Sequence, residues 1–244
     1  MVGSHGTALC AVPRCSTPTA ATAVDLVHLR EPLNPYGERL KKSEYEVRPV
    51  ALRVAQELVA AHHYCRWGSN TGTFVHGLFL RSNPHTCLGV AWWIPPTKGA
   101  ALATHPSAWQ AVLALSRLVV LPSQPKNAAS FLIMGSVKLI QADGRWQKLV
   151  TYADTRMGHT GGIYKATNWK YIGLTQPSTT WVDSEGRTVA KKAGGHTRTV
   201  AEMEALGYRR IGDFKKLKFT MDLKPTRKPA PFHGFTPGLF DEMA

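Results

Sequence analysis

The chain has 244 residues, of which 43% are hydrophobic and 9% aromatic, and these globular values exclude a largely disordered protein. Lys and Arg number 30 against 16 Asp and Glu, so the net charge is +14 at pH 7. Such an excess favours a polyanionic partner such as nucleic acid, or an anionic membrane surface, over an acidic scaffold. No segment approaches the roughly 18 apolar residues of a membrane helix, and the four cysteines form no CxxC pair. We therefore expect a cytoplasmic protein with reduced thiols and no membrane partner.

The first part of the chain predicts a leader, one helix and two strands. Residues 1–45 are polar and interrupted by prolines, so we expect a flexible leader. Apolar residues recur at helical spacing over 50–61, which predicts a helix leading into a His–His–Tyr sequence. Residues 74–80 and 86–94 have the pattern of strands joined by a Ser–Asn–Pro turn.

The middle of the chain alternates helices with strands. A helix over 107–115 has Ser107 as its predicted N-cap, and a helix over 127–140 has Asn127. The other expected elements are a strand at 115–121, a strand at 147–152, a short helix at 160–169 and a strand that begins at Tyr171. This alternation predicts an α/β fold with a mixed central sheet flanked by helices, and we place its catalytic core at residues 46–176.

The last part, residues 177–244, is expected to be a basic C-terminal extension that contacts DNA. Residues 185–228 contain twelve Lys or Arg and five Asp or Glu, with the densest run at Lys215, Lys216 and Lys218. A charge run is usually a solvated surface. In a segment with one dominant sign, however, we favour contact with phosphates.

A loop at 122–130 leads directly into a predicted helix N-terminus. Free backbone N–H groups and the helix dipole make such an end an anion site, so Asn127, Ala128 and Ser130 are candidates for binding a cosubstrate. Ser136 is a second candidate for the serine contact. The alternative is an ordinary capped helix, because the loop has no glycine-rich fingerprint.

The segment Val150–Gly173 (VTYADTRMGHTGGIYKATNWKYIG) carries the most chemistry. A strand ends in Asp154, a glycine-flanked turn carries His159, and a helix presents Tyr164. The segment resembles the second half of the acetyltransferase fold of the GNAT superfamily, with Asn168–Trp169 in place of the usual Gly–Phe. That resemblance implies a tyrosine hydroxyl that protonates the leaving thiolate of acetyl-coenzyme A. The alternative is a core tyrosine on an amphipathic helix.

Three phrases together carry a more specific resemblance. They are AHHYCR at 61–66, LSRLVV with PKNAAS within 115–130, and YADTRMGHTGGIY at 152–164. Over residues 48–176 they resemble the Mom family of phage DNA-modification proteins. Membership would imply a GNAT-like fold and the conversion of adenine in double-stranded DNA to N6-carbamoylmethyladenine. That product would protect phage DNA from restriction in the cytoplasm of the infected bacterium.

The resemblance also implies roles for individual residues. Tyr64, Asp154 and Tyr164 would be catalytic, with the carboxylate accepting or orienting the N6 proton and the phenols donating to the donor's carbonyl or leaving group. We expect all three to converge around an adenine drawn out of the duplex. The expected substrate contacts are His63, Arg66 and His159.

The sequence leaves the cosubstrate unidentified. Acetyl-coenzyme A or another activated donor fits the resemblance, but the usual GNAT pyrophosphate loop (Q/R-x-x-G-x-G/A) is not recognisable. A divalent metal such as iron is an alternative cofactor, held by His62, His63 and His159 near Asp154. Neighbouring residues on one helix point about 100° apart, which argues against His62 and His63 binding one ion together.

Two other functions stay open. An ordinary GNAT enzyme would acetylate a small amine or a protein and would need no basic extension. A non-catalytic nucleic-acid-binding protein would depend on Lys215 and Lys216 but not on Asp154 or Tyr164. The segment that carries Asp154 and Tyr164 favours an enzyme, because a cleft that only binds phosphates has no need for a carboxylate.

Overall fold

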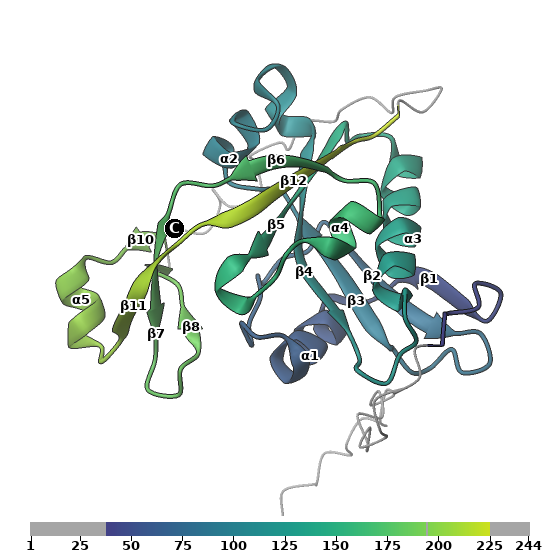
Figure 1. Ribbon diagram of the computed structural model, residues 1–244, viewed down its shortest axis with the longest axis horizontal. Coiled ribbons are helices and arrows are strands. Elements are labelled where there is room, and N and C mark those ends of the chain that lie inside the picture. Colours follow the sequence, from purple (N-terminus) through teal and green to yellow (C-terminus); the bar gives the residue numbers. More distant parts are fainter. Residues whose placement is uncertain (1–37, 194, 225–244) are drawn as a thin grey trace, which may run out of the picture.

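The structure is a computed structural model that describes residues 38–193 and 195–224. A seven-stranded sheet with helices on both faces forms its larger part, and a smaller group of strands with one helix projects from one end (Figure 1). The predicted α/β class with a mixed central sheet flanked by helices is confirmed. Most of the predicted leader, residues 1–37, lies outside the described residues.

The large sheet has the strand order β1-β2-β3-β4-β5-β12-β6. Its strands are β1 (Tyr45–Pro49), β2 (Phe74–Leu80), β3 (Gly89–Ile94), β4 (Val112–Val120), β5 (Lys148–Asp154), β12 (Lys216–Asp222) and β6 (Lys170–Leu174). Neighbouring strands are antiparallel except β4 and β5, which run parallel. Two parallel strands need a crossover connection, and the helix α3 (Ala128–Asp143) provides it.

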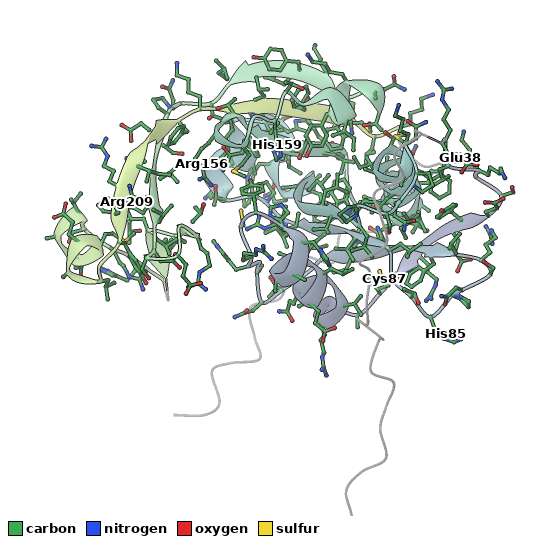
Figure 2. The ribbon with its side chains drawn as sticks, turned by 60° about the horizontal axis from the view of Figure 1, so that its bottom comes forward. Glu38, His85, Cys87, Arg156, His159 and Arg209 are labelled. Atoms are coloured by element: carbon green, nitrogen blue, oxygen red, sulfur yellow. The ribbon has the colours of Figure 1, made fainter. Side chains whose placement is uncertain are left out.

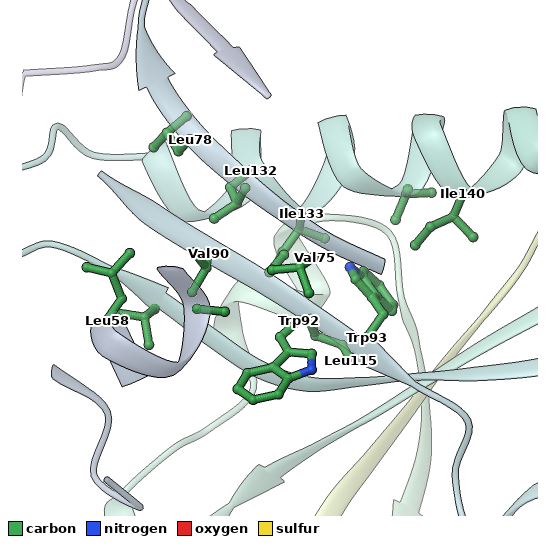
Figure 3. Packing of buried hydrophobic residues seen from close by; sticks show 14 of the residues in the cluster. Leu58, Val75, Leu78, Val90, Trp92, Trp93, Leu115, Leu132, Ile133 and Ile140 are labelled. Atoms are coloured by element: carbon green, nitrogen blue, oxygen red, sulfur yellow. The ribbon is translucent and has the colours of Figure 1, made fainter. Parts of the chain in front are cut away.

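Helices cover both faces of this sheet. The others are α1 (Leu52–His62), α2 (Lys98–Leu102), the 3-10 helix η1 (Pro106–Ala111) and α4 (Gly162–Ala166). Figure 3 shows Leu58 of α1 and Leu132 and Ile133 of α3 packing from opposite sides of the strands. In the part of the chain that the structure describes, no helix is both long enough and apolar enough to cross a membrane.

Trp92 and Trp93 show how the core is divided between the two faces. Both side chains are fully buried. The Trp92 indole donates to the Thr71 carbonyl at 3.0 Å, and the Trp93 indole donates to the Ser136 hydroxyl at 2.7 Å. Ser136 also lies 2.5 Å from Nδ1 of the buried His76. The two large rings therefore bury apolar surface while their N–H groups keep hydrogen-bond partners.

The predicted helix at 50–61, strand at 74–80 and helix at 127–140 are confirmed as α1, β2 and α3. The helix expected at 107–115 is wrong. η1 ends at Ala111 and β4 begins at Val112, so Ser107 caps no α-helix. The apolar run that looked helical belongs to a strand that lies between β3 and β5, and the side chains of its first four residues are buried.

Residues 38–49 correct the end of the predicted leader. The amide of Leu40 donates to the Lys126 carbonyl at 3.1 Å, and the Lys126 amide donates to the Glu38 carbonyl at 2.9 Å. The next residues form β1, which pairs with β2 and begins at the buried Tyr45. Pro49 is tolerated because β1 is an edge strand of the sheet.

Between β6 and β12 the chain leaves the large sheet. This insertion, residues 178–214, contains a three-stranded antiparallel sheet, a two-stranded ribbon and a helix. Its elements are β7 (Ser178–Val182), β8 (Thr188–Val189), β9 (Lys192–Ala193), β10 (His196–Thr197), α5 (Val200–Ala205) and β11 (Arg209–Phe214). Thr199 opens α5 with a capping box, because its hydroxyl accepts from the Glu202 amide and the Glu202 carboxylate accepts from the Thr199 amide.

The strand β12 corrects the predicted domain boundary at residue 176. It pairs with β5 on one side and with β6 on the other, so it belongs to the large sheet rather than to a separate basic extension. Phe219 is fully buried, and Leu217 packs against the same core. Lys216 and Lys218 alternate with these apolar residues, which is the pattern of a half-buried strand. The sequence prediction treated the lysines as a charge run and therefore missed this strand.

Candidate active site

A cavity opens where the parallel strands β4 and β5 separate. The two strands pair only over residues 112–114 and 148–150 and diverge beyond that point. The cavity has a volume of about 480 Å³. Its walls come from β4 (Leu115, Ser116, Leu118), β5 (Tyr152, Ala153), the residues after α1 (His63, Tyr64), the turn after β5 (residues 158–162) and α4 (Ile163, Tyr164). The carboxyl ends of parallel strands are where α/β folds place ligands.

Two predicted catalytic residues meet at this cavity although 90 positions separate them. The Tyr64 hydroxyl, just after α1, lies 3.4 Å from Oδ2 of Asp154 at the end of β5. Burial, followed by the neighbouring Cys65 thiol and the Asp154 carboxylate, raises the pKa of Tyr64 well above its usual value. Tyr64 is therefore a neutral phenol at physiological pH and can donate to the carboxylate.

Asp154 is held in place before any ligand binds. Its Oδ1 accepts from the Arg156 amide at 3.0 Å, which caps the short 3-10 helix η2 (Thr155–Met157). The side chain is buried, with 8% of the residue exposed, and does not itself line the cavity. Asp154 is connected to the cavity by its hydrogen bond with the hydroxyl of Tyr64, which does line the cavity. Across the sheet, Lys216 of β12 is its direct strand partner, so the two side chains leave the same face of the sheet.

Two histidines pack around Tyr64. The His63 ring stacks on Tyr64 with centroids 4.4 Å apart, and His159 meets the ring edge-on at 5.7 Å. The Cys65 amide donates to Nδ1 of His63 at 3.1 Å, so the neutral ring carries its proton on Nε2. Burial, followed by the charges of Arg117 and His159, lowers the pKa of His63 to about 4. His63 is therefore neutral at pH 7.

Tyr164 forms another wall of the same cavity. Its ring packs against Phe219 at 5.3 Å and against Trp169 at 5.8 Å, measured between centroids. Burial raises its pKa, and the hydrogen bond with the Thr151 hydroxyl opposes that rise. Tyr164 is thus both a packed tyrosine and a cavity residue, so the two alternatives weighed from the sequence are not exclusive.

A glycine-rich turn carries His159 between β5 and α4. Gly158 and Gly161 both adopt φ of +71°, a conformation that side-chain-bearing residues rarely take. At Gly161 a Cβ atom would also overlap the Phe219 ring. The turn can therefore lie directly on β12, which places His159 at the cavity. In Figure 2, Arg156 lies between His159 and the insertion strand that carries Arg209.

The loop predicted to bind a cosubstrate does not reach this cavity. Asn127 stands at the N-cap of α3, but its φ of 70° is left-handed and its side chain makes no capping hydrogen bond, which corrects its predicted role as a cap. Ala128 is buried. Ser130 and Asn127 line a different cavity of about 740 Å³, bordered by Lys42 and Lys138. Their part in binding a cosubstrate stays a prediction.

Ser136 is placed in the core rather than at either cavity. It is fully buried, and its hydroxyl is shared between Trp93 and His76. These partners use its hydrogen-bonding capacity inside the protein. The alternative assignment of the cosubstrate contact to Ser136 is therefore wrong.

The predicted DNA-contacting cations differ in their availability. The Arg66 guanidinium donates to the Ala60 carbonyl at 3.1 Å and to the Ala61 carbonyl, so it caps the C-terminus of α1. The Lys218 Nζ donates to the Ala103 carbonyl at 3.2 Å. Burial, followed by the nearby Lys148, lowers the pKa of Lys218. Lys216 is half-buried, and Lys215 is exposed.

The alternative metal site is not assembled. Among the described residues, no group of three or more His, Cys, Asp or Glu side chains is arranged to hold a metal ion. His63 accepts the Cys65 amide through Nδ1 and stacks on Tyr64, while His62 is exposed at the end of α1.

Several site residues were not identified from the sequence. Ser116 and Tyr152 line the cavity, Thr151 interacts with Tyr164, and Arg117 lies close enough to affect the pKa of His63. Their strands were expected, but the sequence gives no sign of the point where β4 and β5 separate. These strand residues belong to the site only because of the way the strands pair in the tertiary structure.

The model of the Mom protein family matches residues 44–227. The chain belongs to the Mom family. This membership identifies it as a transferase and confirms the resemblance seen in the sequence. The match extends past residue 176 and includes β12, in agreement with the corrected domain boundary. A search of curated proteins gives no significant match.

Similar solved structures include three acetyltransferases. An N-acetyltransferase from Staphylococcus aureus is 14% identical, with 74% of this chain and 99% of that chain covered and a TM-score of 0.45. Spermidine N-acetyltransferase from Vibrio cholerae, solved with CoA and spermine, is 8% identical, with coverage of 74% and 96% and a TM-score of 0.46. A GNAT-family acetyltransferase from Streptococcus pneumoniae is 10% identical, with coverage of 74% and 100% and a TM-score of 0.43.

Proposed function

We propose that this Mom-family protein transfers a carbamoylmethyl group to N6 of adenine in double-stranded DNA and so protects phage DNA from restriction. The family match and the net charge of +14 support this function. The observation that carries it is the Tyr64–Asp154 pair at a cavity that Tyr164 also lines. Such a pair is an acid–base device, for which a protein that only binds DNA has no need.

The chemistry follows from the weak nucleophilicity of adenine N6. Its lone pair is delocalised into the ring, so the amine must lose a proton as the new N–C bond forms. In the proposed pose the Tyr64 oxygen takes this proton while its own proton passes to Oδ2 of Asp154, 3.4 Å away. The bond between the transferred methylene carbon and its leaving group breaks, and Tyr164 donates a proton to that group.

The donor is an activated small molecule that carries the carbamoylmethyl group with a leaving group on its methylene carbon. Acetyl-coenzyme A does not supply that group directly, because its leaving thiolate is on the carbonyl carbon and its transfer would acetylate N6. The space between β4 and β5 suits such a donor. Beyond Ala114, β4 does not pair with β5, so the backbone N–H and C=O groups of β4 on that side form no hydrogen bonds with β5. Ser116 and Leu118 lie on this stretch and line the cavity. Backbone N–H and C=O groups at this point can hold the polar parts of a donor beside Tyr164.

Double-stranded DNA is the proposed macromolecular partner. Taking a base out of the helix costs a few kcal/mol of stacking and pairing. Contacts between phosphates and the excess of Lys and Arg offset that cost, and they make binding strongly dependent on salt.

The function is tested by expressing the protein in a bacterium, digesting the total DNA to nucleosides and searching for a heavier deoxyadenosine by mass spectrometry. We expect a mass increase equal to one carbamoylmethyl group from the wild type and none from Asp154→Asn. The control is Asp222→Asn, the same chemical change at a residue whose side chain is 75% exposed and paired with Lys148 at 3.0 Å.

Unmodified deoxyadenosine from a well-folded wild type would falsify the proposal. An acetylated small amine or protein from the same cells would favour the ordinary acetyltransferase. Equal modification by the wild type and Asp154→Asn would remove the carboxylate from the mechanism.

A further inference from the structure

Trp67 is the one exposed tryptophan of this protein. All seven tryptophans lie in the described part of the chain, and the other six are buried or half-buried. Trp67 is 45% exposed. An exposed indole leaves a large apolar surface in water, so its orientation and neighbours indicate what it contacts.

The ring is held rigidly although it is exposed. Its Nε1 donates to the carbonyl of Thr188 in the insertion at 3.2 Å. The Arg117 guanidinium lies 5.4 Å from the ring centroid, and its Nε donates to the Trp67 carbonyl at 3.0 Å. Because the indole N–H already has a partner, the exposed remainder of the ring offers only its apolar π surface.

Trp67 follows shortly after a residue that lines the catalytic cavity. It follows Tyr64 by three residues, after a turn in which Arg66 adopts φ of 57°. Arg117, which holds the Trp67 backbone, lies on β4 between the cavity residues Ser116 and Leu118. Trp67 and Arg117 do not themselves line the cavity, but each adjoins its wall, Trp67 through Tyr64 along the chain and Arg117 through its neighbours on β4.

The insertion is attached at the same place by two hydrogen bonds. Thr188 receives the Trp67 indole on its backbone carbonyl, and its hydroxyl accepts from the Arg156 guanidinium at 2.8 Å. Arg156 is the residue whose amide holds Asp154. Thr188 of β8 and Arg156 thus connect the Trp67 indole to the Asp154 carboxylate.

We propose that Trp67 is a stacking platform for a nucleobase of the DNA strand that enters the cavity, and that the insertion positions it through Thr188. This inference rests on the proposed function, because it assigns the surface that receives the DNA. Aromatic rings bind bases of any sequence by stacking, and the nearby arginines contribute positive charge for the phosphates. A ring already fixed by Thr188 loses little freedom on binding.

The test is a fluorescence titration at low salt with a short single-stranded deoxyadenylate oligonucleotide, together with anisotropy of the same labelled oligonucleotide. Stacking quenches an indole, and Trp67 is the one exposed tryptophan. We expect the wild type to be quenched, Trp67→Phe to bind but lose the quenching, and Trp67→Ala to bind roughly 5- to 150-fold more weakly. Trp109→Phe, which removes a half-buried indole beside Lys98, should keep both signals.

Undiminished quenching in Trp67→Phe, or unchanged affinity in Trp67→Ala with an unchanged melting temperature, overturns the stacking function. The two proposals separate in this design. If the wild type modifies no adenine but the Trp67 results hold, the transferase function fails and the stacking surface stands. If adenine is modified equally by the wild type and Trp67→Ala with equal affinity, only the stacking inference fails.

Discussion

At the scale of single residues, the catalytic proposal depends on the environment of two phenols. Burial keeps both Tyr64 and Tyr164 neutral, and only Tyr64 has a carboxylate within hydrogen-bonding distance. Their roles should therefore differ although the side chains are identical. Tyr64 mediates proton removal, whereas Tyr164 donates to the departing group.

Removing the Tyr64 hydroxyl should slow the reaction without unfolding the protein. We expect Tyr64→Phe to lower the yield of modified deoxyadenosine roughly 10²- to 10⁴-fold, the usual contribution of general acid–base catalysis. Tyr208→Phe in the insertion is the matched control and should leave the yield unchanged. Thermal unfolding of both variants checks the fold, and a fully active Tyr64→Phe would show that Asp154 acts without this hydroxyl.

The buried His76 makes stability depend on pH. It is 2% exposed, and burial lowers its pKa to about 4 from the 6.5 of an exposed histidine. Protonation therefore favours the unfolded chain. The stability from a neutral His76 is complete above pH 6.5 and is lost as the pH falls towards 4.

His76→Gln should flatten this pH dependence, because glutamine can still hydrogen-bond to Ser136 but does not titrate. The fall in the free energy of unfolding between pH 7 and pH 4 should become smaller by on the order of 3 kcal/mol. Urea unfolding near pH 7 and near pH 4 measures it. Identical pH slopes for wild type and variant would contradict the assignment; His63 accounts for a remaining slope, since its pKa is also lowered to about 4.

At the scale of elements, the turn before α4 depends on two glycines with the same backbone conformation and different surroundings. Both have φ of +71°, but a Cβ at Gly158 meets nothing within 4 Å, whereas a Cβ at Gly161 overlaps Phe219. Gly158→Ala should therefore cost only the strain of a left-handed residue, about 1 kcal/mol.

Gly161→Ala should cost several kcal/mol and displace the turn, because the buried Phe219 ring must also move. Denaturant unfolding compares the two variants. Equal destabilisation would mean that the turn does not need its close contact with β12.

The elements also explain which sequence predictions succeeded. The helix α1 and the strand β2 follow from local apolar spacing, which is the information that a sequence contains directly. The helix expected at 107–115 failed because its apolar run has helical spacing but lies in the middle of a sheet. Burial on both faces removes the alternation by which a strand is recognised.

At the scale of the whole molecule, the positive charge is not distributed as the sequence suggested. The insertion, residues 178–214, contains six Lys or Arg and five Asp or Glu, so it is nearly neutral. Several of its charges are paired locally, as Arg187 is with Asp183 and Arg210 with Asp213. The basic run after it belongs largely to β12.

DNA binding should fall steeply with salt, and individual lysines should contribute unequally. Lys215 is exposed, whereas the Nζ of Lys218 donates to the Ala103 carbonyl. If Lys215 contacts a phosphate, Lys215→Gln should reduce the slope of log K against log salt by about one, and Lys218→Gln should leave it unchanged. Anisotropy titrations over a range of salt concentrations measure both slopes, and the reverse order would refute this distribution.

By itself the sequence determined the α/β class, most helices and strands, the family and the residue types of the site. These properties are encoded in local spacing and in short motifs such as YADTRMGHTGGIY. The tertiary structure alone decided that Tyr64 meets Asp154, that β12 returns across the insertion, and that Ser136 belongs to the core. Contacts between distant segments depend on how strands pair and where they separate, and no local pattern of side chains carries that information.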